Sequence, residues 1–179
     1  MATINPLLKF DPLVSPNQQS GLSFNATVGY EFGLVSDKII NQIGLFYPTG
    51  GYTQNHTIKL WENNNSSSPL VTVTINAGTY SNVVDYFYWV NISQITLTGS
   101  NYRIGAYYAS SPSALGDLYA RKYPLANLLV PEPNTIFNGG YLAFGDAYPT
   151  VKATDPVDAS YFGPNISFKK GPTGQLWPA

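Results

Sequence analysis

Apolar and polar residues alternate in short stretches along this chain, whereas the spacing of an amphipathic helix is scarce. In residues 57–62, for example, Ile58 and Leu60 fall on one side and Lys59 and Trp61 on the other. A period of two predicts β-strands with one face in a core. Runs of this kind, rich in β-branched and aromatic residues and bounded by turn-forming residues, occupy residues 23–30, 38–46, 57–62, 70–75, 83–90, 95–98, 101–108, 141–144 and 166–169.

The spacing of these runs predicts an all-β fold, an antiparallel β-sandwich of jelly-roll type. Gly, Asn and Ser between the runs supply the turns. Residues 20–168 are expected to form the sandwich, with residues 109–140 as a long Pro-rich loop insertion that holds one short helix near 113–120. Residues 1–19 are expected to be an extended N-terminal arm, and residues 169–179 a C-terminal tail.

The composition of the chain excludes several classes of function. Only 11% of the 179 residues are charged, against about 25% in ordinary soluble domains. The chain has no Cys and one His, which excludes a disulfide framework and a multi-His metal site. The net charge of −1 argues against a nucleic-acid surface. No apolar run approaches the roughly 20 residues of a membrane-spanning helix, and the N-terminus lacks the features of a signal peptide.

Candidate catalytic residues are few. His56 has no nucleophile signature beside it. Asp85, Asp117 and Asp146 could converge in space as catalytic carboxylates, but their spacing does not require it. No calcium-loop motif is present, although a Ca²⁺ site built from carbonyls and one or two Asp would leave no motif. We therefore expect no enzyme activity, no metal site and no cofactor.

Aromatic residues are abundant in this chain, which has 14 Tyr and 3 Trp. In residues 85–90, Tyr86 and Tyr88 fall on one face and Phe87 and Trp89 on the other, so both faces carry rings. Such residues fill cores, and they also suit protein interfaces and sugar stacking. All three roles stay open, and the residues we select as candidate glycan-stacking positions are Tyr52, Trp89 and Tyr107.

The two ends carry apolar side chains on irregular, Pro-rich sequence. Proline prevents such an arm from forming a central strand or a helix alone. The arm could lie along a neighbouring subunit, or it could fold back on its own domain. Under the first alternative the expected interface residues are Pro6, Leu7, Leu8, Phe10 and Pro12 of the arm and Leu176 and Trp177 of the tail.

Four segments carry a resemblance to a known family: VGYEFGLVSDKIINQIGLFYPTGG, HTIKLWENN, ITLTGSNYRIGAYY and YFGPNISF. Through them, residues of about 20–168 resemble a bacterial β-sandwich family of unknown function. That family occurs in exported, multidomain and PEP-CTERM-sorted surface proteins. The resemblance implies a non-enzymatic adhesion or binding module, and it implies no catalytic residues.

Two functions follow as expectations. The first is a structural protein of a symmetric assembly, either a virion surface component (capsid decoration, tail or fibre) or a surface filament subunit, that engages its neighbours through its arms. The alternative is an extracellular carbohydrate-binding or adhesion module. The expected partners are subunits of the same assembly or a glycan, at a virion or extracellular surface, with no nucleic acid and no membrane span.

Overall fold

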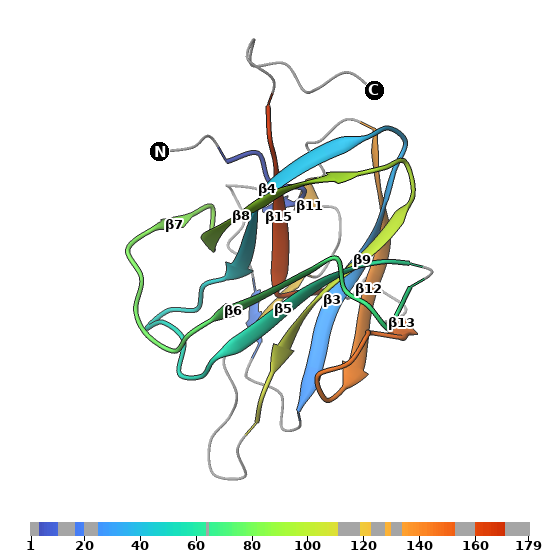
Figure 1. Ribbon diagram of the computed structural model, residues 1–179. Helices are drawn as coiled ribbons and strands as arrows, with labels where there is room; N and C mark the ends of the chain where they lie inside the picture. The colour runs from blue at the N-terminus through green and yellow to red at the C-terminus, as the bar shows by residue number, and fades with distance from the viewer. Residues whose placement is uncertain are drawn as a thin grey trace.

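The computed structural model is an antiparallel β-sandwich (Figure 1). It describes residues 4–10, 17–19, 25–63, 65–110, 119–122, 128–129, 134–152 and 160–170. The described residues contain no helix, and hence none that could cross a membrane. The predicted fold class is confirmed.

Two sheets form the layers of the sandwich. One has six strands, in the order β13 (Val151–Lys152), β12 (Thr135–Phe144), β3 (Ala26–Leu34), β9 (Asn101–Tyr108), β5 (His56–Glu62) and β6 (Val71–Ile75). The other has four strands, in the order β15 (Pro164–Phe168), β4 (Lys38–Phe46), β8 (Phe87–Leu97) and β7 (Val83–Val84). Every pairing is antiparallel, so the two sheets have the connectivity of hairpins and long crossings rather than of βαβ units.

Two small sheets lie beside the sandwich. One pairs β1 (Lys9–Phe10) with β11 (Leu128–Leu129). The other contains β14 (Ser160–Phe162), β10 (Tyr119–Lys122) and β2 (Asn17–Gln19). The expectation of one long loop over residues 109–140 is therefore wrong for β10, β11 and the first half of β12. The expected helix near 113–120 lies largely outside the described residues, and its last two residues belong to β10.

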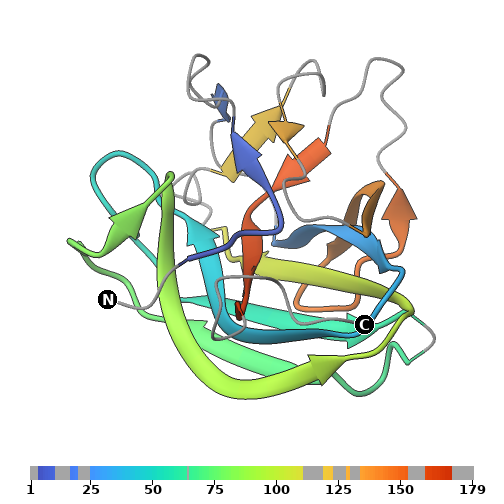
Figure 2. The same ribbon diagram turned by 90° about the horizontal axis from the view of Figure 1, so that it is seen from above.

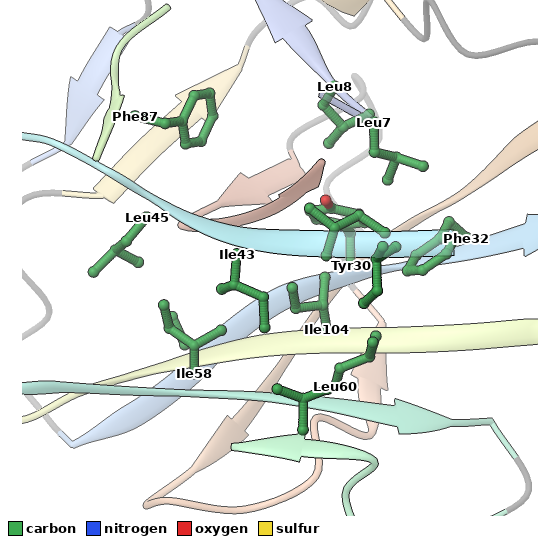
Figure 3. Close-up of a cluster of buried hydrophobic side chains, with 14 of the residues drawn as sticks. Leu7, Leu8, Tyr30, Phe32, Ile43, Leu45, Ile58, Leu60, Phe87 and Ile104 are labelled. Atoms are coloured by element: carbon green, nitrogen blue, oxygen red, sulfur yellow. The ribbon is translucent and has the colours of Figure 1, made fainter. Parts of the chain in front are cut away.

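The core lies between the two sheets, where alternate side chains of each strand meet (Figure 3). On the six-stranded sheet, Tyr30 and Phe32 of β3 lie next to Ile104 of β9, and all three are fully buried or nearly so. Ile43 and Leu45 of β4 face them from the other sheet. Each such side chain contributes about 1.5–3 kcal/mol by leaving water. The predicted alternation in residues 57–62 is present, because Ile58 and Leu60 both point into this core.

The outer face of the six-stranded sheet is covered too, which the sequence did not reveal. The segment 145–149 lies across β3, β9 and β5 there. Gly105 makes room for it, since a Cβ at this position would lie 2.6 Å from Thr27 Cγ2 and 3.3 Å from Pro149 Cγ. Trp61, on the same face, is buried because Tyr148 packs edge-on against its ring at 5.4 Å. Strands β3 and β9 are consequently buried on both faces.

The N-terminal segment 4–8 runs beside β15, at the open edge of the four-stranded sheet (Figure 2). The Leu7 and Phe168 amides donate to Ile166 O and Asn5 O, each at 2.9 Å. Leu7 and Leu8 are buried in the core (Figure 3), and Pro6 bridges to Ser167. The prediction that these residues anchor a neighbouring subunit is corrected here: they complete the core of their own domain.

Candidate functional site

The three predicted glycan-stacking residues do not form a shared surface. Trp89 is 3% exposed, and its ring covers Gly44, where a Cβ would lie 2.8 Å from the indole. Tyr52 is 4% exposed, and its hydroxyl donates to Leu45 O at 3.0 Å. Both are interior residues, so a sugar cannot stack on them. Tyr107 is half-buried on the outer side of β9 and remains a prediction.

A different set of tyrosines gathers at one end of the sandwich, where β7 leads into β8 at the left of Figure 1. We call it the tyrosine cluster, and it consists of Tyr47, Tyr52, Tyr80 and Tyr88. The rings of Tyr80 and Tyr88 stack with centroids 4.0 Å apart. Tyr47 meets the ring of Tyr52 edge-on at 5.2 Å and that of Tyr80 at 6.5 Å. Such contacts stabilise a ring pair by about 0.5–1.5 kcal/mol beyond area burial.

Hydrogen bonds fix the cluster to the backbone around it. The amide of Tyr80 donates to the Tyr47 hydroxyl at 2.8 Å, and the Tyr80 hydroxyl donates to Asn76 O at 2.9 Å. The loop that carries Tyr52 is tied to Gly78 by two backbone bonds of 3.0 and 2.8 Å. The rings are therefore held in place before any ligand arrives, which lowers the entropy cost of binding.

A strained turn lies beside the cluster. Asp85 and Tyr86 join β7 to β8 and have φ values of +50° and +69°. Two consecutive positive φ angles are those of a type I′ hairpin turn, in which the second position favours Gly. A side chain in this conformation costs roughly 1–2 kcal/mol. Tyr86 nevertheless occupies it, is 41% exposed, and accepts a backbone bond from the Tyr47 amide at 2.9 Å.

The charge at this end is minimal. In the two segments that carry the cluster and the turn, residues 47–58 and 76–90, Asp85 is the only Asp, Glu, Lys or Arg. Burial raises the pKa of the Tyr88 phenol, and the neighbouring Tyr80 raises it further. Tyr88 therefore remains a neutral hydroxyl at physiological pH. An anionic ligand would find no cation among these two segments.

The described residues offer no catalytic constellation here. His56 is fully buried, and its Nδ1 lies 3.0 Å from Tyr107 O. The rings of Tyr52 and Tyr108 flank the imidazole at 5.3 and 4.6 Å. A general acid or base must reach a substrate proton, and this ring is enclosed by the protein.

Two of the three carboxylates that the sequence singled out lie on different sheets. Asp85 lies in the hairpin turn of the four-stranded sheet. Asp146 lies over the outer face of the six-stranded sheet, where it pairs with Lys59 at 2.8 Å. Asp117 falls outside the described residues. Within the described part of the chain, no three His, Cys, Asp or Glu side chains gather as a metal site would need.

The remaining interface predictions fall mostly beyond the described part. Phe10 belongs to β1, opposite Leu128 of β11. Pro12, Leu176 and Trp177 lie outside the described residues. No protein-family model and no curated protein sequence matches the chain. The resemblance of residues 20–168 to the bacterial surface-protein family stays a prediction.

The sequence contained part of the signal for the site that the structure assembles. Tyr80, Tyr86 and Tyr88 are visible as tyrosines near turn residues. The alternation correctly places Tyr88 opposite Phe87 and Trp89, whereas Tyr86 lies in the turn before β8. The cross-strand register decides which face each ring takes: Tyr88 lies opposite Leu45, on the face toward the six-stranded sheet, and Trp89 lies opposite Gly44, on the other face. The missing side chain of Gly44 leaves the space that Trp89 fills.

Proposed function

We propose that this protein is a non-catalytic binding module for neutral glycans, and that it binds them at the Tyr80–Tyr88 pair of the tyrosine cluster and at the adjoining Asp85–Tyr86 turn, with the buried Tyr52 only supporting the rings. The observation that carries the proposal is the exposed Tyr86 side chain in a left-handed conformation, beside the stacked pair of Tyr80 and Tyr88. Backbone strain of this kind clusters at ligand-binding positions. A stability cost that is retained at an exposed aromatic residue supports a role in recognition.

The chemistry of the site suits a sugar. Pyranose rings present apolar C–H faces that pack on aromatic rings, and tyrosine combines such a ring with a hydroxyl that can bond to sugar hydroxyls. The Asp85 carboxylate adds an acceptor, since an ionised carboxylate accepts from several donors. The absence of Lys and Arg from residues 47–58 and 76–90 favours neutral over sulfated or sialylated sugars.

The test is a glycan array, followed by calorimetric titration of the best-binding neutral oligosaccharide. We expect Tyr86→Gly to abolish measurable binding. The same change relieves the strained turn, so we expect it to keep or raise the melting temperature. Tyr88→Ala is expected to weaken binding at least tenfold, because it removes one ring of the stacked pair.

Tyr107→Ala serves as the matched control, because Tyr107 is a half-buried tyrosine of the other sheet. It should bind as the wild type does. Loss of binding in Tyr107→Ala with retention in Tyr86→Gly would move the site to β9. Absence of binding to every neutral glycan would overturn the proposal.

A second function, as a subunit of a symmetric assembly at a virion or cell surface, is favoured by a separate observation. The edge strand β6 carries no charged residue. Uncharged edges promote pairing between chains. With Leu7 and Leu8 inside the domain, this edge is a better candidate contact than the N-terminal arm. The oligomeric state in solution tests it.

A further inference from the structure

The edge strand β6 lacks the features that normally keep a β-sheet edge unpaired. One side of β6 pairs with β5 through five residue pairs, from Leu60 opposite Val71 to His56 opposite Ile75. Its other side has no partner strand among the described residues. Natural edges are usually protected by Lys, Pro or a bulge. The strand reads Val-Thr-Val-Thr-Ile, all β-branched, and its pairing with β5 has no shift of register.

The surroundings of this edge are uncharged over an unusual length. Residues 63–84, which contain β6 and its flanking turns, include no Asp, Glu, Lys or Arg. Neither do residues 86–102, which contain β8. A charged partner would therefore find no complementary group on β6 itself, and Lys59, which lies opposite Thr72 on β5, is already paired with Asp146. Two identical copies of β6, in contrast, can meet without like-charge repulsion.

A shallow groove of about 330 Å³ runs along the same edge. Val71 and Val73 of β6 line one side, and Ile92 and Ile95 of β8 line the other. Leu70, at the end of the groove, is 43% exposed. Strand β7 covers β8 only at Phe87 and Tyr88, so this side of β8 is also without a partner strand in the described part of the chain. An extended strand would satisfy the backbone groups and cover the apolar side chains.

The sequence of β6 is complementary to itself. When two copies pair antiparallel about Val73, Val71 faces Ile75, Thr72 faces Thr74, and Val73 faces Val73. Apolar β-branched residues meet apolar β-branched residues, and threonine meets threonine; both kinds of pair stabilise a sheet. A contact with two-fold symmetry requires such self-complementarity.

We propose that β6 is a self-association edge, and that two copies of this chain pair antiparallel through Val71–Ile75 to join their six-stranded sheets into one. The inference does not depend on glycan binding. It gives the protein a symmetric dimer, which would present two copies of any site elsewhere on the domain.

The test compares charge variants by sedimentation velocity over roughly 1 µM to 1 mM, the range in which moderate and weak complexes dissociate. The wild type should shift from monomer to dimer within this range. Thr72 and Thr74 are exposed, so charges there should leave the fold intact. In Thr72→Glu/Thr74→Glu each Glu would face a Glu of the second copy, and we expect a monomer throughout.

Complementary charges should restore the contact. A Thr72→Lys/Thr74→Lys variant should also be monomeric alone, and an equimolar mixture with the Glu variant should form a heterodimer. The control is Gln94→Glu/Thr96→Glu, which adds the same charge at two exposed positions of the other sheet. It should dimerise as the wild type does.

Amide exchange locates the contact independently. Amides of Val71–Ile75 should become more protected as concentration rises in the wild type, and not in the Glu variant. A wild type that stays monomeric up to 1 mM, or a dimer that persists in the Glu variant, would overturn the proposal. Loss of the dimer in the β8 control alone would place the contact on β8 and overturn it as well.

Discussion

Arg103 shows how a single residue holds the outer cover of this sandwich. Its guanidinium lies 3.8 Å from the centre of the Tyr141 ring and 4.8 Å from that of Tyr148. It donates to the Glu31 carboxylate and, at 2.6 Å, to Pro149 O. Only about a tenth of each charged side chain is exposed, and Asn138 donates to the same carboxylate at 3.2 Å. Strands β9 and β3 and the covering segment are joined at this one point.

Removing one member of this ion pair should be costly, because the other charge would stay buried without a partner. We expect Glu31→Gln to lower the free energy of unfolding by about 3–5 kcal/mol. The double variant Glu31→Leu/Arg103→Met should recover a large part of that loss. Urea unfolding of Glu31→Gln and of the double variant measures both effects.

The variant Lys59→Met breaks a second ion pair and provides the comparison for the loss of the Glu31–Arg103 pair. Lys59 and Asp146 form the more exposed ion pair of the same face, with 21% and 39% of their side chains accessible. Loss of the Lys59–Asp146 pair should lower the free energy of unfolding by at most about 1 kcal/mol. Equal losses in Glu31→Gln and Lys59→Met would contradict the special role of Arg103.

At the scale of elements, β15 is a strand with two neighbours that lie far away in the sequence. One is β4, and the other is the N-terminal segment 4–8. Asn165 joins the segment to the strand from within the core. Its side-chain amide donates to Leu8 O at 2.8 Å, and its oxygen accepts from the Leu8 amide at 3.3 Å. The segment is held by this side chain as well as by backbone bonds.

Asn165→Ala should therefore loosen segment 4–8. The change removes two bonds to Leu8 and leaves buried backbone groups unsatisfied, so we expect a loss of roughly 2–4 kcal/mol in the free energy of unfolding. Amide exchange should show faster exchange at Leu7 and Leu8. Asn82→Ala is the control, since Asn82 is exposed in the loop before β7. Similar losses in both variants would rule out this role of Asn165.

Strands could be located from the sequence where the alternation is continuous. Residues 38–46 and 101–108 match β4 and β9 at both ends. Strand β12 begins six residues earlier than predicted, because a bulge at Asn138 and two glycines interrupt its pattern. Strand β8 continues through residues 91–94, three of which are polar and exposed and hence give no clear alternation. The burial of Leu7 and Leu8 could not be predicted, since it depends on a partner strand about 160 residues away.

For the molecule as a whole, the scarcity of charge limits how stability responds to pH. The low charged fraction leaves few groups whose ionisation is coupled to folding. The buried phenol of Tyr30 is the main exception, since desolvation raises its pKa well above the ordinary value. Its hydroxyl lies 3.4 Å from Asn165 Oδ1, at the centre of the core.

Tyr30 should make the protein sensitive to alkali. The unfolded chain releases the phenolic proton near pH 10, whereas the folded protein retains it, so the unfolded state binds fewer protons above that pH. Stability should be intact below about pH 10 and should fall above it, by up to about 1.4 kcal/mol per pH unit for this one proton.

Urea unfolding of the wild type and Tyr30→Phe between pH 8 and about 11 tests the expectation. The variant should lose about 1 kcal/mol at pH 8 through the missing hydroxyl, and its alkaline slope should be shallower. Identical slopes in the two proteins would show that Tyr30 does not control the alkaline transition.

The position of β15 also bears on the order in which a newly made chain can acquire its structure. β15 is the last strand of the sandwich in the sequence, yet it lies between β4 and residues 4–8. Until the ribosome has synthesised Pro164–Phe168, Leu7 and Leu8 have no strand to pack against and one edge of β4 is unpaired. The domain therefore cannot finish folding early in translation. The sandwich can close its core only after all of its described strands have been made, and until then exposed strand edges make chaperone binding advantageous.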